Sequence, residues 1–150
     1  MILNEHLIVT IEGMDKDGNG FFHHEKTIVF VEGALEGEKC EVEIINIISN
    51  CAFAKLINIL EASPLRIEPE CPYYALCGGC TMQHMEYELE SKIKENKVLN
   101  TLKFVGKLSS PKVMPIISAD NQYHYRNKAI IPFGIKNNEI VCGMYKKKSH

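Results

Sequence analysis

The sequence lacks the features that would place the chain in a membrane or outside the cell. It has no basic N-terminal segment followed by an apolar core, and no uninterrupted apolar run of about 18 residues. We therefore expect neither a signal peptide nor a membrane span, and we expect a cytoplasmic protein. In that reducing compartment the six cysteines are better interpreted as thiols or metal ligands than as a disulfide framework.

Recognisable catalytic motifs are also missing. No Gly-rich turn joins a strand pattern to a helix pattern, and no stretch offers a nucleophilic cysteine with a nearby general base. We therefore assign no catalytic and no cofactor-binding residue in this chain.

The chain length limits the number of domains, and the charge distribution indicates where a phosphate-binding surface would lie. With 150 residues and a 45% hydrophobic content, the chain can form one domain or two small ones, and a monomer is expected. The net charge of −2 hides an asymmetry, because residues 1–70 hold 5 Lys/Arg against 13 Asp/Glu, whereas residues 121–150 hold 6 against 1. A surface that binds phosphate is therefore expected near the C-terminal end.

The first part of the chain has the pattern of short strands. Residues 7–11 alternate with a period of two, 27–31 are mostly β-branched or aromatic, and 40–48 and 51–60 follow on either side of a turn. Strands at this spacing predict a small OB-like barrel of five strands over residues 1–62. Cys40 and Cys51 fall inside these strands and are interpreted as small core residues.

Residues 14–20 have the composition of a hairpin turn. They also resemble the start of a calcium-binding EF-hand loop, with Asp15, Asp17 and Asn19 at its first, third and fifth positions. Position twelve is Lys26 instead of the bidentate glutamate, and the flanks are strand-like. A hairpin turn is therefore favoured over a calcium site.

Three cysteines crowd one short segment after a Pro-containing linker. Cys71 and Cys77 have five residues between them, Cys77 and Cys80 have two, and two glycines fill that last gap. Such spacing lets three thiolates converge on one metal, but a closed site usually needs a fourth ligand. His84 could complete a Cys3His zinc site, and a distant cysteine could complete a [4Fe-4S] site. Free thiols or a disulfide remain the structural alternative.

The second unit, residues 63–150, is predicted to be an α+β segment. A helical pattern covers residues 85–105, with Glu88–Lys92 and Glu90–Lys94 as favourable i, i+4 pairs and Gly106 as the C′ residue after its end. Strand-like runs follow at 113–117, 123–133 and 139–145. The predicted fold class is therefore mixed and mainly β.

At this point the residues resemble a known family. The motif Cys71-x5-Cys77-Gly78-Gly79-Cys80-x2-Gln83-His84 resembles the iron-sulfur motif of the RNA (uracil-5-)-methyltransferases. The first block resembles a TRAM domain, an OB-like barrel at the front of many of these enzymes, in its turn at 17–20 and in residues 29–38. Residues 125–129 and 143–150 look like stretches of the family's central domain.

The resemblance implies a function and a set of sites. It identifies the chain as the N-terminal part of a 23S rRNA uridine-C5 methyltransferase that uses S-adenosylmethionine and binds ribosomal RNA, with the methyltransferase domain absent from these residues. It implies a [4Fe-4S] cluster on Cys71, Cys77 and Cys80, with a fourth ligand expected beyond residue 150. Cys142 is not expected to be that ligand, because it lies inside a strand pattern.

RNA contacts are expected from aromatic and basic residues near the C-terminus. These are Tyr125, Arg126, Lys128, Lys146, Lys147 and Lys148. Aromatic rings can stack on unpaired bases while cations meet phosphate. The alternatives are an ordinary amphipathic strand for the first three and a solubilising tail for the lysine run. The alternative for the whole chain is a stand-alone RNA-binding module with a Cys3His zinc site and no activity.

Overall fold

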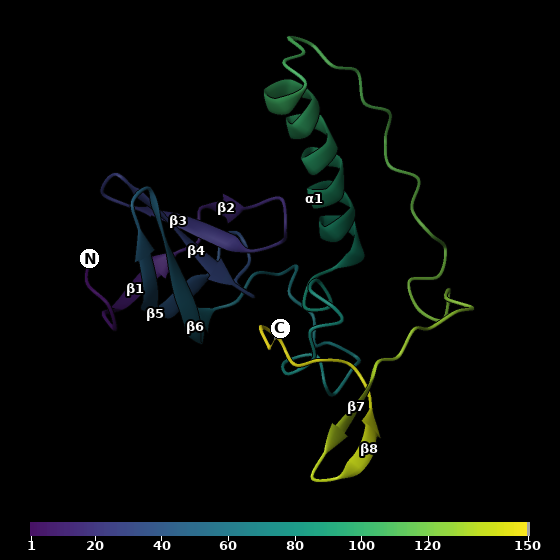
Figure 1. Cartoon of the computed structure of the whole chain (residues 1–150). Coiled ribbons are helices and arrows are strands. Elements are labelled where there is room, and N and C mark those ends of the chain that lie inside the picture. The colour runs from purple at the N-terminus through teal and green to yellow at the C-terminus, as the bar shows by residue number, and fades with distance from the viewer. Residues whose placement is uncertain (150) are drawn as a thin grey trace.

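The computed structural model describes residues 1–149, and its fold is mixed and mainly β, as predicted (Figure 1). A strand-rich N-terminal unit is followed by one long helix, an extended arm and a C-terminal hairpin. The elements are β1 (His6–Thr10), β2 (Gly13–Met14), β3 (Gly20–His24), β4 (Thr27–Glu32), β5 (Lys39–Ile48), β6 (Cys51–Glu61), α1 (Tyr87–Asn100), a π-helical turn η1 (Thr101–Val105), β7 (Phe133–Lys136) and β8 (Glu139–Cys142).

The N-terminal sheet has six labelled strands in the order β1-β5-β6-β4-β3-β2. Only β4 and β6 are parallel. Strands β1 and β2 are two halves of one bent strand, because Ile11 exchanges backbone hydrogen bonds with residues 37 and 38 while Glu12 donates to the Phe21 carbonyl. This bent strand touches both ends of the sheet and closes it into a five-stranded barrel, the architecture predicted from the alternation.

The barrel interior is filled by aliphatic side chains that alternate along each strand. Val29, Val31, Val42 and Ile44 are completely buried, and Ile11 is nearly so. Period-two alternation places every second residue on the inner face, which is why these positions could be predicted from the sequence. The intervening residues form the outer face of the barrel.

Cys40 is completely buried, as expected, and burial raises the pKa of its thiol to about 11. The expectation for Cys51 was wrong, because this residue is only half-buried. In the strand register it pairs with Ile28 and Ile48, two outward positions. Alternation explains the difference, since Ala52 takes the inward position instead.

The linker after β6 is attached to the barrel by a buried ion pair. The side chain of Glu38 is completely buried, and both its oxygens accept hydrogen bonds from the Arg66 guanidinium at 2.6 and 2.8 Å. The backbone N–H groups of Leu35 and Ser63 donate to the same carboxylate. Arg66 also donates to the Gly33 carbonyl at 2.6 Å. Burial opposes ionisation of Glu38, but these hydrogen bonds outweigh it and lower the pKa of the carboxyl.

A second, smaller core joins the barrel to α1. Its buried members are Leu35 from the barrel and Met85 and Ile93 from the second unit, and Met14 packs against them. Lys97 of α1 donates to a carboxylate oxygen of Asp17 at 3.0 Å at the edge of this contact. The barrel and the helix therefore meet through apolar packing with a polar rim.

The hairpin turn before β3 is confirmed. Asp15 Oδ1 accepts the backbone N–H groups of Asp17 and Asn19, both at 2.8 Å, and Oδ2 accepts the Asn19 side-chain amide. Gly18 has a φ of +85°, which a glycine adopts without strain. The carboxylate that would begin a calcium loop thus holds the turn together.

The helix prediction is confirmed over most of its length, including the Glu90–Lys94 ion pair, whereas no Glu88–Lys92 ion pair is found among the described residues. The predicted C′ position was wrong by one residue. Gly106 has a right-handed backbone (φ −73°) and closes the π-helical turn by donating to the Thr101 carbonyl. Lys107 takes the left-handed conformation one residue later.

The strands predicted at 113–117 and 123–133 are not formed, and only Phe133 of these residues is in a strand, as the first residue of β7. This part of the chain runs as an extended arm from the end of η1 to the hairpin (Figure 1), and the Ala119 N–H donates to the Tyr87 hydroxyl of α1 at 3.0 Å. A β-strand requires a neighbouring strand for its backbone hydrogen bonds, and the arm has none in the described residues. The run at 139–145 forms a strand only as far as Cys142.

No helix among residues 1–149 is long and apolar enough to cross a membrane.

Candidate metal loop and nucleic-acid interface

The three cysteines lie in one loop between the linker and α1. Cys71 and Cys77 are half-buried, Cys80 is exposed, and all three are free thiols. The Gly79 backbone N–H donates to Cys77 Sγ at 3.4 Å, and a donor of this kind stabilises the thiolate form of a metal ligand. The loop therefore carries soft donor atoms with one supporting backbone contact.

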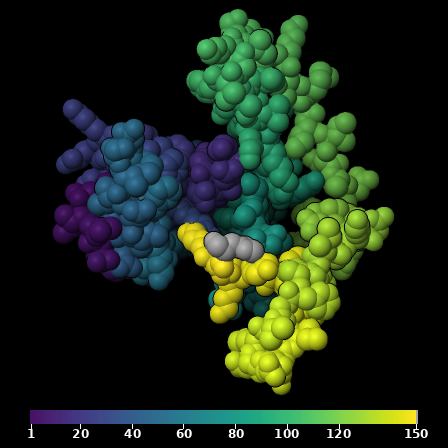
Figure 2. All heavy atoms as spheres, viewed as in Figure 1, coloured from purple at the N-terminus to yellow at the C-terminus, as the bar shows by residue number. Residues whose placement is uncertain are grey.

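The C-terminal segment pairs with this loop. Cys77 and Lys146 form an isolated antiparallel bridge. The Gly78 N–H donates to the Tyr145 carbonyl at 2.9 Å, and the Lys147 N–H donates to the Leu76 carbonyl at 3.0 Å. A Cβ on Gly78 would lie 3.3 Å from the Tyr145 oxygen, so glycine permits this close approach. In Figure 2 the C-terminal residues accordingly lie between the barrel and the hairpin.

Tyr74 and His84 hold the two ends of the loop together. The Tyr74 hydroxyl donates to the Thr81 carbonyl at 2.6 Å and lies 2.6 Å from His84 Nδ1. Because the hydroxyl has only one proton, the His84 Nδ1–H donates to the tyrosine oxygen. His84 Nε2 is then an unprotonated, buried nitrogen without a partner in the described residues. Burial, and after it the charge of Arg66, lower the pKa of His84 to about 4.

The structure does not bring the predicted ligands together. Among residues 1–149, no group of three or more His, Cys, Asp or Glu side chains lies close enough to hold a metal ion. This applies both to the three cysteines alone and to their combination with His84. The donor chemistry of the loop fits a thiolate-bound metal, whereas a complete ligand shell is not formed by these residues.

The predicted RNA-binding residues lie in two separate places. Tyr125 is 67% exposed on the arm, with the Arg126 guanidinium 5.5 Å from its ring centroid, and Lys128 is exposed nearby in sequence. Lys147 and Lys148 instead reach the barrel, where they form ion pairs with Glu32 at 3.5 and 2.9 Å. The hydrogen bond from Lys148 is the main cause that lowers the pKa of Glu32.

Lys147 also lies over the Tyr74 ring, with its ammonium nitrogen 4.7 Å from the centroid. A cation over an aromatic face is attracted by the ring quadrupole. Lys147 therefore connects three parts of the molecule: the C-terminal segment, the cysteine loop and the barrel. Lys146 is exposed and has no ion pair among those found for the described residues.

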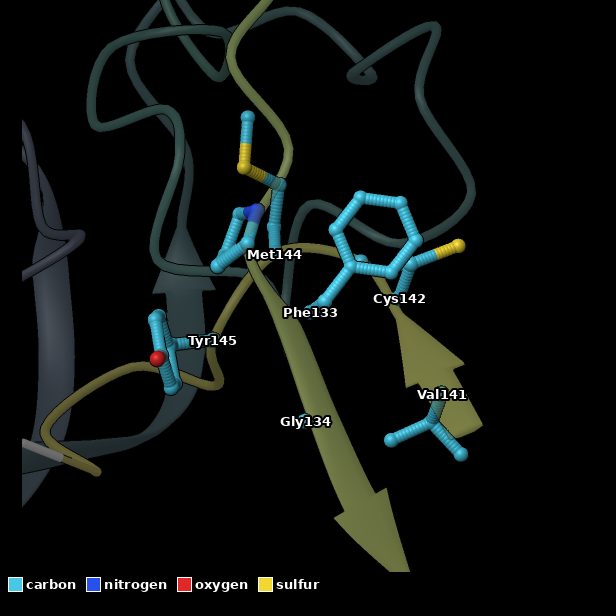
Figure 3. A pocket seen from close by; sticks show the side chains of 8 residues that line it. Phe133, Gly134, Val141, Cys142, Met144 and Tyr145 are labelled. Atoms are coloured by element: carbon cyan, nitrogen blue, oxygen red, sulfur yellow. The ribbon is translucent and has the colours of Figure 1, made fainter. Parts of the chain in front are cut away.

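A shallow hollow lies beside the C-terminal hairpin, lined by residues from both strands and by the segment that follows (Figure 3). Its side chains include Phe133, Val141 and Met144. Cys142 is exposed here, at the end of β8, where it pairs in register with Phe133. Cys142 thus lies in a strand, as the sequence indicated.

Two features of these surfaces could not be found from the sequence. The Glu38–Arg66 pair joins residues 28 positions apart, and an aromatic row on the outer face of the barrel joins three separate strands. The available signal for the row was Phe30, which lies between the buried valines Val29 and Val31 of β4. That signal shows only once the strand register is known.

Comparison with known proteins identifies the class of the barrel. Residues 4–57 match the family model of the TRAM domain. The barrel therefore belongs to the TRAM domain family, as the turn at 17–20 and residues 29–38 predicted.

The relationship extends through the rest of the chain. A protein of Halalkalibacterium halodurans named as an uncharacterized RNA methyltransferase is 34% identical over 147 residues, which are 98% of this chain and 32% of that protein. One from Oceanobacillus iheyensis with the same description is 38% identical with the same coverage. The chain is thus homologous to RNA methyltransferases along nearly its whole length, and the relationship predicted from the cysteine motif is confirmed. The chain spans about a third of the length of these relatives.

Among solved structures, the chain is similar to the tRNA (uracil-54, C5)-methyltransferase of Pyrococcus abyssi in complex with S-adenosyl-L-homocysteine. The identity is 26%, the match covers 65% of this chain and 21% of that protein, and the TM-score is 0.49.

Proposed function

We propose that this chain is the RNA-recognition and [4Fe-4S]-binding part of a cytoplasmic, monomeric 23S rRNA uridine-C5 methyltransferase that depends on S-adenosylmethionine. The observation that carries the proposal is the homology of 98% of the chain to RNA methyltransferases. The TRAM barrel at the front of the chain supports a role in binding RNA. In this proposal residues 1–62 form the barrel unit, and residues 63–150 belong to the cluster-binding and central unit.

The proposed cluster ligands in this chain are Cys71, Cys77 and Cys80. Their thiol chemistry, and the Gly79 N–H that points at Cys77 Sγ, support an iron-sulfur site. The fourth ligand is proposed beyond residue 150. The pairing of residues 145–147 with the loop supports this, because it brings the chain close to the cysteines just before that point.

The proposed RNA surface combines Tyr125, Arg126 and Lys128 with the lysine run at 146–148. An exposed tyrosine beside an arginine can stack on an unpaired base, and the lysines can meet phosphates. S-adenosylmethionine supplies the methyl group when bound, and no residue of this chain is proposed to bind it or to act as the catalytic nucleophile.

Activity is tested with labelled S-adenosylmethionine and unmodified RNA. We expect the full-length protein to label 23S rRNA at C5 of a uridine, and the 150-residue chain to give no label above a no-protein control. Parallel reactions with unmodified tRNA decide the substrate class. Label in tRNA alone would overturn the ribosomal assignment while keeping the uridine chemistry.

The metal is tested on anaerobically purified full-length protein. We expect a brown protein with broad absorbance near ~400 nm, as iron-thiolate charge transfer gives. Cys77→Ser should bleach it, and His84→Ala, which removes the buried histidine from the same loop, should not. A colourless protein that holds one zinc ion, lost on His84→Ala, would instead establish the Cys3His module.

The position of the RNA surface is tested by charge reversal. Lys146→Glu and Lys128→Glu should each weaken RNA binding and lower the slope of log K against log salt by about 1 per lost phosphate contact. Lys26→Glu is the matched control, because Lys26 is an equally exposed lysine in the turn between β3 and β4. Equal losses from all three variants would show that the contact surface is placed wrongly.

A further inference from the structure

The outer face of the barrel carries a row of three phenylalanines on adjacent strands. Phe21 of β3 pairs in register with Phe30 of β4, and Phe30 pairs in register with Phe53 of β6. Residues directly opposite one another in a sheet point to the same face. The neighbours Val29 and Val31 point into the core, so the three rings lie on the outside. We call these three residues the aromatic row.

The rings of this row are accessible, and two of them pack against each other. Phe53 is 39% exposed, and Phe21 and Phe30 are half-buried. The Phe30 and Phe53 ring centroids lie 5.8 Å apart with an interplanar angle of 32°. At the other end, the Phe21 ring lies over Gly13, where an added Cβ would come within 2.9 Å of it. Packing against neighbours on both sides fixes the rings without covering their outer surfaces.

Positive charges border this row on one side. Lys55 follows Phe53 by two positions on β6, and Glu32 follows Phe30 by two positions on β4, so both share the outer face. Glu32 in turn holds Lys147 and Lys148 of the C-terminal segment. Lys55 also pairs in register with Glu43 of β5, so three lysines and two carboxylates lie next to the aromatic row, an excess of positive charge although residues 1–70 as a whole are strongly acidic.

We propose that the aromatic row is a stacking platform for unpaired bases of RNA, and that Lys55, Lys147 and Lys148 contact the phosphates of the same strand. This inference rests on the proposed RNA function and names the surface of the barrel that serves it. A row of aromatic rings beside cations is the arrangement that binds single-stranded nucleic acid with little sequence preference.

Charge decides between RNA and a polypeptide as the occupant. A stable protein interface requires a broad apolar patch with few charges at its centre. Here the outward Ile28 and Cys51 lie beside the row on one side, but charged Glu32 and Lys55 pair in register directly beside it on the other. The adjacent lysines suit the regular negative charge of a phosphate backbone.

In this proposal Glu32 competes with RNA phosphates for two of the lysines. Without RNA it holds Lys147 and Lys148 at the edge of the row, at 3.5 and 2.9 Å. A phosphate then competes with this carboxylate for the two ammonium groups. Removing the carboxylate charge with Glu32→Gln should therefore tighten RNA binding and steepen its dependence on salt.

The test is a fluorescence anisotropy titration of the full-length protein with a single-stranded RNA octamer and with the corresponding duplex. Phe53→Leu keeps an apolar side chain but removes the aromatic ring, and we expect it to weaken binding of the single strand by ~10-fold, the loss typical of one stacked base. Phe30→Leu should act similarly. Ile8→Ala is the matched control, because Ile8 is an exposed apolar residue of β1 outside the row. Thermal unfolding of each variant verifies that it is folded.

The outcomes separate this inference from the proposed function. If the wild-type protein binds the octamer and both phenylalanine variants bind it equally well, the aromatic row is not the platform, and the RNA function stands. If the wild-type protein binds no RNA, the proposed function itself fails. A 2-aminopurine base placed in the octamer should change its fluorescence on binding to wild-type protein but not to Phe53→Leu. The same change in both would overturn stacking on Phe53.

Discussion

Removing the arginine of the buried ion pair should destabilise the protein strongly. In Arg66→Met, the Glu38 carboxylate keeps only the N–H groups of Leu35 and Ser63 from its four hydrogen-bond donors. Loss of one partner from a buried pair typically costs about 3–5 kcal/mol, because the remaining charge stays buried without compensation. With a urea m-value of roughly 1–3 kcal/mol/M, this corresponds to a midpoint shift on the order of 1–5 M.

The stabilities of the wild type and of Arg66→Met should also depend differently on pH. In the wild type the pKa of Glu38 is lowered, so its contribution to stability is present above the unfolded value near 4.5 and is lost as the pH falls below it. In Arg66→Met, burial dominates and raises that pKa, so the variant should lose stability as the pH rises. The difference between the two proteins should therefore be larger at pH 7 than at pH 5.

Urea unfolding followed by circular dichroism, at both pH values, measures these free energies. Glu38→Gln combined with Arg66→Met removes the uncompensated charge, and we expect the double variant to be more stable than Arg66→Met alone. A loss below about 1 kcal/mol in Arg66→Met, equal at pH 5 and pH 7, would refute the assignment of this pair as a buried anchor.

Three further predictions concern the barrel. Gly13→Ala should lower stability by about 1–3 kcal/mol, because its Cβ would meet the Phe21 ring at 2.9 Å; a thermal shift smaller than that of an exposed Gly→Ala change elsewhere would contradict it. Asp15→Ala removes three hydrogen bonds from the turn and should cost about 1–3 kcal/mol while accelerating amide exchange at Asn19; unchanged exchange would argue against the turn. Iodoacetamide should label Cys40 only after unfolding, since its thiol is completely buried and its pKa is raised to about 11; mass spectrometry that finds early labelling would contradict this burial.

The sequence predicts local structure better than contacts between distant residues. The barrel strands follow from alternation, because a buried inner face requires an apolar residue at every second position, as at Val29 and Val31. The same reasoning was wrong for the run at 123–133 except at Phe133, because its composition is strand-like but residues 123–132 have no neighbouring strand among residues 1–149 to supply hydrogen bonds. Strand propensity is therefore insufficient without a pairing partner.

In the candidate site, too, the local pattern could be predicted from the sequence and the contacts between distant residues could not. The cysteine spacing predicts a metal loop because all three thiols lie within ten residues of one another. The contact of Lys147 and Lys148 with Glu32 spans more than a hundred residues and depends on how the C-terminal segment returns to the barrel. No local pattern encodes that return, so the lysine run could be identified as basic but not as paired.

The pairing of the C-terminal segment with the cysteine loop has a consequence during synthesis of the chain. Cys77 bridges to Lys146, which is translated 69 residues later. At a translation rate of roughly 5–20 residues per second, the cysteine loop is synthesised about 3–14 s before its pairing segment. During that interval the nascent loop lacks the backbone hydrogen bonds that residues 145 and 147 later provide. Delivery of a metal to the nascent chain would therefore meet an open loop, whereas delivery after release would meet one already closed by its own C-terminal segment.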